Sequence, residues 1–244
     1  MTAQRSVSLL VSFLVIAAVP AHALVPGGGL ANTDCRVVYE GVDATSGASG
    51  VVCLDGDPGC DGDGAADGTC RFSVKICTGV PTPSCTPTAV DGIATGGAQL
   101  ATPAGAHGCG ADTVVEVPVG QAVGSTLIAT GDGGVRDVDY LNLCCRATAG
   151  AFDAAICALA VDPTVSGCAR KTVPLAARHA FLRARTLVAQ AAANPTHARP
   201  RRRAQRALEV VRARAQRLAT HDTCGFALGL MATHAEQALS GVAP

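Results

Sequence analysis

Hydrophobic and polar residues alternate strictly over residues 70–77, a pattern typical of a half-buried β-strand. Cys70, Phe72 and Val74 share its apolar face, whereas Arg71 lies on the other face. Five more segments of strand character lie between clusters of Gly, Pro and Asp: 35–42, 51–54, 113–119, 125–130 and 138–145. About six short strands with turn signals between them predict an antiparallel β-sandwich.

The hydrophobic pattern changes in the last third of the chain, where apolar residues recur every three or four positions. Residues 175–192 and 224–239 have this helical spacing, and the first of these segments ends at Asn194 and Pro195. The clearest apolar stripe consists of Ala204, Leu208, Val211, Ala215 and Leu218. Three helices with short connections predict a small helical bundle. The expected fold class is therefore α+β, with a disulfide-rich antiparallel β-sandwich followed by a C-terminal helical bundle.

The first 23 residues have the three-part pattern of a cleaved signal peptide. Arg5 is followed by an apolar run over residues 7–19 and by the small-residue triplet 21–23. The apolar run is shorter than the roughly 20 residues that a membrane-spanning helix needs. We therefore predict a secreted, periplasmic or cell-surface protein without a transmembrane segment after cleavage, and a flexible N-terminal arm over residues 24–33.

All twelve cysteines follow this segment, and an even number of cysteines in an exported protein predicts a disulfide framework. No Cys-x-x-Cys pair occurs, so the usual zinc and thioredoxin-type spacings are missing. Crosslinks compensate for a core without Trp and with only two Tyr, because large aromatic side chains dominate core burial. The predicted half-cystines are Cys35, Cys53, Cys60, Cys70, Cys77, Cys85, Cys109, Cys144, Cys145, Cys157, Cys168 and Cys224.

Strand geometry limits how these cysteines pair. Cys70 and Cys77 lie about 23 Å apart in an extended segment, so they need different partners. Cys144 and Cys145 point to opposite faces of their strand, which predicts one bond into the sandwich interior and one to an outer loop or the helical region. The expected pairs are Cys35 with Cys53, Cys60 with Cys70, Cys77 with Cys85, Cys109 with Cys145, and Cys224 with Cys157 or Cys168. The last pair would join the two parts of the chain covalently.

The zero net charge conceals two oppositely charged parts. Residues 24–169 carry 5 basic and 16 acidic side chains, whereas residues 170–244 carry 13 basic and 3 acidic ones. This division and the change of hydrophobic pattern predict two domains. We expect a disulfide-rich β-sandwich over residues 34–147 and a basic helical bundle over residues 148–244.

A loop over residues 55–69 holds five aspartates among glycines. These carboxylates repel one another unless they are hydrated or share a cation, and Ca²⁺ accepts six to eight oxygen ligands in irregular geometry. The loop resembles the Asp-Gly calcium loops of thrombospondin type 3 repeats and, less closely, dockerin and EF-hand loops, although it is a single copy and lacks a full EF-hand register. A calcium site and a hydrated acidic loop stay open as alternatives. The candidate ligands are Asp55, Asp57, Asp61, Asp63 and Asp67.

The wider segment over residues 34–85 resembles uncharacterised exported Cys-rich proteins of environmental bacteria. Such proteins carry a Cys- and Asp/Gly-rich stretch like residues 53–64 before a strand like residues 70–74. The resemblance implies an exported, disulfide-rich fold and no known activity.

A second candidate site is a cluster of arginines near the start of the central helix. Such a cluster attracts phosphate and other polyanions. Nucleic acid is not the expected partner, because the chain is exported and no aromatic residues are interleaved for stacking. The candidate partners are an envelope polysaccharide, an anionic lipid or a protein, including the acidic part of this chain, and a solvated helix face is the simpler alternative. The cluster comprises Arg199, Arg201, Arg202, Arg203 and Arg206.

No motif of a known catalytic site occurs in the chain, so we name no catalytic residue. His221 adjoins Asp222 and lies near Cys224, a grouping that helix capping beside a disulfide explains better than catalysis. We therefore predict an exported structural or binding module of the cell envelope or extracellular space, with calcium as the candidate cofactor. The alternatives are a secreted hydrolase with an unrecognised site and a polyanion-binding protein that acts through its Arg-rich helix.

Overall fold

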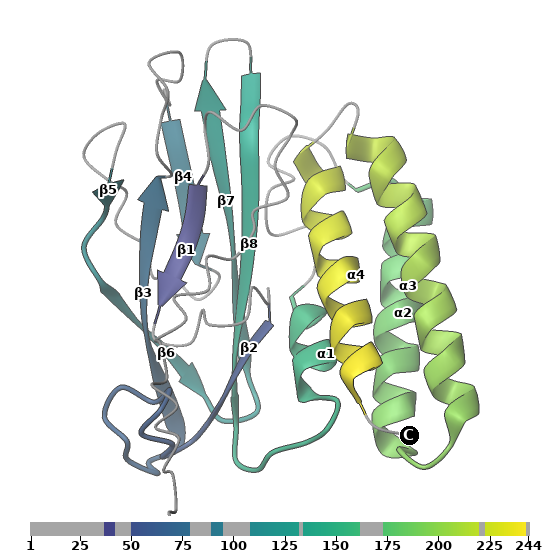
Figure 1. Cartoon of the computed structure of the whole chain (residues 1–244), viewed down its shortest axis with the longest axis horizontal. Helices are drawn as coiled ribbons and strands as arrows, with labels where there is room; N and C mark the ends of the chain where they lie inside the picture. Colours follow the sequence, from purple (N-terminus) through teal and green to yellow (C-terminus); the bar gives the residue numbers. More distant parts are fainter. Residues whose placement is uncertain are drawn as a thin grey trace, which may run out of the picture.

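The computed structural model describes residues 37–41, 50–78, 89–94, 108–131, 134–161, 173–219 and 223–242. Within these ranges the chain forms two four-stranded sheets and four helices, with the strands preceding the helices. Figure 1 shows the sheets on one side of the molecule and the helices on the other. The predicted α+β class is therefore confirmed. The predicted signal peptide and N-terminal arm lie outside the described residues.

One sheet is built around the strand with strict alternation. β3 (Thr69–Thr78) pairs antiparallel with β1 (Val37–Gly41), β5 (Gly108–Cys109) and β6 (Thr113–Pro118). The predicted apolar face is buried as expected, with Phe72 only 4% exposed and its neighbours on that face equally covered. Alternation along β3 therefore identified both the strand and its inward face correctly.

The other sheet has the order β2-β8-β7-β4. Its members are β2 (Gly50–Leu54), β8 (Gly134–Arg146), β7 (Ala122–Gly131) and β4 (Ala89–Ala94). β7 pairs antiparallel with β8 and with β4, but β2 runs parallel to β8. The prediction of a wholly antiparallel fold is therefore wrong at β2. A parallel pair needs a long crossover connection, and the chain between β2 and β8 provides one.

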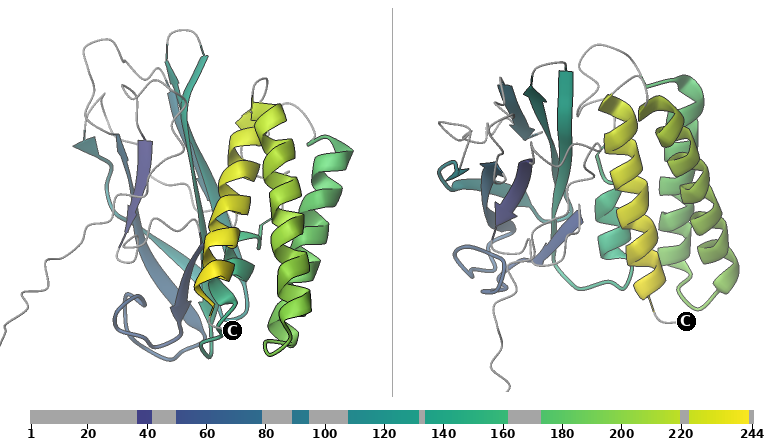
Figure 2. Two further views of the ribbon diagram at one scale, coloured as in Figure 1. Left: turned by 45° about the vertical axis from the view of Figure 1, so that its right-hand side comes forward. Right: turned by 45° about the horizontal axis from the view of Figure 1, so that its top comes forward.

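The three predicted helices are present as α2 (Leu175–Ala193), α3 (Ala198–Ala219) and α4 (Thr223–Gly241). A fourth helix, α1 (Asp153–Ala158), is too short to show a helical period in the sequence. α1 contacts β2 and α4 contacts β8, so these two helices lie against the second sheet. Figure 2 shows from two further directions that α4 lies between this sheet and α3.

Two separate clusters of buried apolar side chains stabilise these parts. One cluster includes Phe72 and Val117 of one sheet and Leu143 of the other, and the cluster among the helices includes Phe181 and Leu208. The predicted helical stripe is buried at its first four positions, Ala204, Leu208, Val211 and Ala215. The predicted domain boundary between residues 147 and 148 stays a prediction.

Three disulfides lie in the described part of the chain. Cys53 bonds to Cys60 at the base of the Asp-rich loop, with their Cα atoms 5.6 Å apart. Cys70 of β3 bonds to Cys145 of β8 and joins the two sheets. The remaining bond runs from Cys144 of β8 to Cys157 of α1. Neighbouring half-cystines thus bond to opposite sides of β8, as strand geometry predicted.

Three of the expected local pairs are wrong. Cys35 with Cys53, Cys60 with Cys70, and Cys109 with Cys145 are excluded by the observed bonds, and so is Cys157 with Cys224. Proximity in sequence decided the three local predictions, whereas the bond between residues 70 and 145 spans 75 residues and joins strands of different sheets. The expected pairs Cys77 with Cys85 and Cys168 with Cys224 involve residues outside the described ranges.

The three disulfides are expected to differ in their contribution to stability. A crosslink removes more entropy from the unfolded chain when its loop is longer, and the sequence separations are 7, 13 and 75 residues. Replacing each pair with Ala should therefore lower the free energy of unfolding by about 2, 3 and 4.5 kcal/mol, in that order. Guanidinium denaturation of the three double variants measures this. A loss that does not follow loop length would contradict the expectation.

Candidate functional site

The Asp-rich loop folds around the buried carboxylate of Asp61, which is 2% exposed. One oxygen accepts a hydrogen bond from the amide of Gly56 (3.1 Å) and the other accepts one from the amide of Arg71 (3.0 Å). Burial alone would raise the pKa of this carboxyl, but the two amide hydrogen bonds hold it below its usual value. The chain turns at Gly56 with a φ of 80°, a backbone conformation that glycine adopts without steric cost. Asp61 is therefore a structural anion at the centre of the loop.

The other four aspartates also accept hydrogen bonds from backbone amides of the loop. Asp57, Asp63 and Asp67 each bind the amide two residues further along the chain, at 2.9 to 3.1 Å. This is the local pattern by which Asp side chains stabilise turns. Asp55 accepts from the amide of Gly68 with both of its oxygens, which closes the two ends of the loop.

Arg71 supplies a cation to this loop from the neighbouring strand. Its guanidinium forms ion pairs with Asp63, with Asp67 at 2.9 Å and with Glu116 at 3.3 Å. The hydrogen bond to Asp67 is the main reason why the pKa of Arg71 is raised. The sequence did not predict this role because Arg71 follows the loop, although the alternation of residues 70–77 places it on the outer face of β3.

The structure brings the five candidate calcium ligands into one loop but not into one cation site. Among the described residues, no group of three or more His, Cys, Asp or Glu side chains is placed to hold a metal ion. Each of the five carboxylates instead meets backbone amides, and two of them also meet Arg71. The calcium site stays a prediction, and the guanidinium offers another way to offset the repulsion between the carboxylates.

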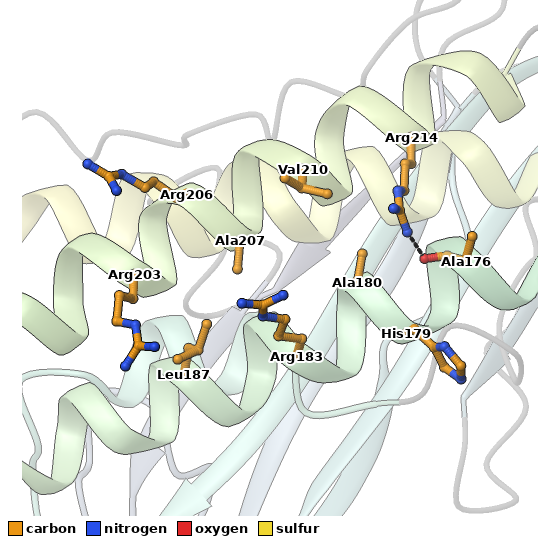
Figure 3. Close-up of a pocket in the computed structure, with 10 residues that line it drawn as sticks. All are labelled: Ala176, His179, Ala180, Arg183, Leu187, Arg203, Arg206, Ala207, Val210 and Arg214. Atoms are coloured by element: carbon orange, nitrogen blue, oxygen red, sulfur yellow. Dashed lines mark hydrogen bonds between the residues drawn. The ribbon is translucent and has the colours of Figure 1, made fainter.

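A second candidate site is a basic groove between α2 and α3, with a volume of about 560 Å³. Figure 3 shows its lining residues, which come from facing sides of the two helices. Arginines and one histidine supply the charged and polar lining, and no acidic side chain belongs to it. We call it the α2–α3 groove. It is lined by Ala176, His179, Ala180, Arg183, Leu187, Arg203, Arg206, Ala207, Val210 and Arg214.

Helical spacing explains why these residues line one groove. Residues 176, 180, 183 and 187 of α2 and residues 203, 207, 210 and 214 of α3 advance by the same steps of four, three and four, which keeps each set on one side of its helix. Arg183 extends from α2 toward Ala207, and Arg203 lies beside Leu187 (Figure 3). At the other end, the guanidinium of Arg214 donates a hydrogen bond to the carbonyl oxygen of Ala176.

The groove contains only part of the predicted arginine cluster. Arg203 and Arg206 line it, and Arg206 projects away from α2 (Figure 3). Arg199, Arg201 and Arg202 are not among its lining residues. Arg201 instead donates to the carbonyl oxygen of Ser240 in α4, at 3.5 Å. The cluster therefore divides between two sides of α3.

Sequence analysis missed three polar residues of the groove: Arg183, Arg214 and His179. Arg183 and His179 belong to α2, a different helix from the predicted cluster, and Arg214 lies three turns further along α3. A signal was nevertheless present, since Arg203 and Arg214 share the spacing that places residues on one helix face. Only the pairing of α2 with α3 brings the two helices' arginines together.

Within the described ranges, no acidic side chain offsets the positive charge of the groove: Arg183, Arg203 and Arg206 form no ion pair there. Arg212, on the side of α3 that faces α4, does pair with Glu236 at 3.3 Å. α2 and α3 together carry eleven arginines and a single acidic residue, Glu209. The α2–α3 groove is therefore suited to an anionic ligand.

Comparison of the chain with protein-family models, curated proteins and solved structures returns no match. This agrees with the prediction that it belongs to no family of known activity. The disulfides fit an extracellular or periplasmic protein. No helix in the described ranges is both long enough and apolar enough to cross a membrane.

Removing the guanidinium of Arg71 should make the loop responsive to calcium. In an Arg71→Ala variant, Asp63, Asp67 and Glu116 lose their shared cation, so a divalent ion that replaces it gains favourable contacts. We expect calcium to raise the Tm of this variant by several degrees more than that of the wild type, in thermal melts with calcium or with a chelator. An equal rise in both proteins would mean that calcium binds the loop beside Arg71, as the sequence resemblance implies.

Replacing Asp61 with Asn should destabilise the protein by about 1–3 kcal/mol at pH 7, because one of its two part-buried amide partners loses its acceptor. The folded-state pKa of Asp61 lies below 3.8, so its contribution is fully present above that value and is lost as the pH falls through the folded-state pKa. The difference between wild type and Asp61→Asn should therefore shrink in acid.

Denaturant titrations at several pH values between 7 and 2 measure this, with Asp57→Asn as the matched control. Asp57 has a single, exposed amide partner, so its replacement should change stability by less than about 0.5 kcal/mol. A deficit of Asp61→Asn that stays constant with pH would contradict the role of its charge.

Proposed function

We propose that this chain is an exported binding module that holds anionic groups in its α2–α3 groove. The observation that carries the proposal is the convergence of Arg183, Arg203 and Arg214 on one groove without an acidic side chain in its lining. A guanidinium presents several N–H donors in a fixed plane and remains charged at all relevant pH values, which suits sulfate, phosphate and carboxylate groups.

The rest of the chain serves as the scaffold in this proposal. We take the two sheets as the halves of the predicted β-sandwich, supported by the buried cluster between them and by the bond between Cys70 and Cys145. The predicted signal peptide over residues 1–23 would export the chain to a compartment in which such bonds form. The Asp-rich loop belongs to this scaffold, since its carboxylates face amides and Arg71, and calcium is its candidate cofactor.

The alternative of a secreted hydrolase finds less support in the groove. Its lining contains His179 but no Ser, Thr, Cys, Asp or Glu side chain that would act as a nucleophile or orient the imidazole. Binding requires only the charge and shape that the groove already has.

A heparin column provides the test, because heparin presents closely spaced sulfate and carboxylate groups. The double variant Arg183→Gln/Arg203→Gln removes two charges from the groove. It should elute at clearly lower salt than the wild type and bind a heparin oligosaccharide about tenfold more weakly, since two solvent-screened charge contacts worth up to about 1 kcal/mol each are lost.

The matched control is Arg185→Gln/Arg202→Gln, which removes the same charge from exposed positions of the same helices outside the groove. This control should elute close to the wild type. If both variants shift equally, the column responds to net charge alone and the groove has no special role.

A further inference from the structure

We infer that the ligand of the α2–α3 groove is an anionic amphiphile: a single alkyl chain with a sulfate, phosphate or carboxylate head. This inference rests on the proposed function and names the class of ligand. A groove that only bound charge would need no apolar lining, whereas this one has apolar side chains between its arginines.

The charges are placed unevenly along the groove. Arg203 lies beside Leu187 at one end, and Arg183 extends from the middle of the groove toward Ala207 (Figure 3). At the other end, Arg214 already donates to the carbonyl oxygen of Ala176. The pair of guanidinium groups is therefore the place for an anionic head, and the engaged Arg214 closes the far end.

Apolar side chains line the groove between its two ends, and we call Ala180, Ala207 and Val210 its apolar floor. Ala180 and Ala207 are small, so the helices leave space above the seam between them, and Val210 is 45% exposed although it is a large apolar residue. A sugar polyanion or a free phosphate would leave this surface in contact with water. An alkyl chain would cover it and gain about 0.8 kcal/mol per fully buried CH₂ group.

The dimensions of the groove suit a chain of medium length. Positions 203 and 214 are eleven residues apart on one helix, which corresponds to about 16 Å at 1.5 Å per residue. The volume of about 560 Å³ lies in the range of small-molecule sites. The geometry thus places the head between Arg183 and Arg203 and the chain along Val210 toward Arg214.

A series of alkyl sulfonates tests this on the full mature protein. Calorimetry with ethane-, hexane-, octane- and decanesulfonate below their micellar concentrations, at fixed ionic strength, compares chain lengths with one constant head. From hexane- to decanesulfonate, affinity should rise by about threefold or more for each two added methylenes, since the open groove buries only part of each group. Decyltrimethylammonium, with the opposite charge, should bind at least tenfold more weakly than decanesulfonate.

Two kinds of variant separate the head site from the floor. Arg183→Gln/Arg203→Gln should weaken binding of every sulfonate, whereas Val210→Asn should remove most of the dependence on chain length and leave ethanesulfonate unchanged. Ala207→Leu, which fills the floor, should act like Val210→Asn. Leu182→Asn is the matched control, because Leu182 is 37% exposed on α2 but does not line the groove, and it should behave like the wild type.

The outcomes distinguish this inference from the proposed function. One outcome is that heparin and the sulfonates require the arginine pair while affinity is the same at every chain length. In that case the inference of an amphiphilic ligand is wrong, and the proposed binding of anionic groups is retained. The same conclusion follows if Leu182→Asn reduces the chain-length dependence as much as Val210→Asn does. If neither heparin nor any sulfonate binds in a way that depends on Arg183 and Arg203, both proposals fail.

Discussion

The two adjacent half-cystines at the end of β8 join the two sheets and the first helix. Successive side chains of a strand point to opposite faces, so Cys145 reaches β3 in the other sheet and Cys144 reaches Cys157 of α1. The fully buried Asn142, two residues earlier and on the same face as Cys144, donates from Nδ2 to the carbonyl oxygen of Cys157 at 2.8 Å. One short stretch of β8 thus fixes β3 of the other sheet and α1.

The close approach of α1 to this sheet depends on a residue without a side chain. A Cβ atom added at Gly50 of β2 would lie 2.6 Å from the backbone nitrogen of Ala158, closer than real contacts allow. α1 could not pack at its present distance with any other residue there. α1 in turn contacts α4, and α4 contacts α3. The position of the helices relative to the sheets therefore follows from the backbone contact at Gly50 and the disulfide of Cys144.

Periodicity predicted the elements with a clear pattern, and contacts between distant segments decided the rest. Alternation at β3 and the stripe of α3 identified their buried faces, because one side of each element faces a core. β4 (Ala89–Ala94) was missed because Asp91 and Gly92 are poor strand formers, and its ladder with β7 overrides that preference. The parallel direction of β2 and the bond between residues 70 and 145 leave no local signal, since each depends on how remote segments come together.

The fold keeps the arginines of the α2–α3 groove apart from the acidic part of the chain. The acidic part of this chain was one of the predicted partners of the arginines, but α4 lies between β8 and α3 (Figure 1). The acidic loop finds its cation in Arg71 of its own sheet, and Glu236 of α4 pairs with Arg212 on the near side of α3. Arg183 and Arg203 belong to neither of these two groups of ion pairs. The fold therefore separates their charges from the acidic residues that balance them in the composition.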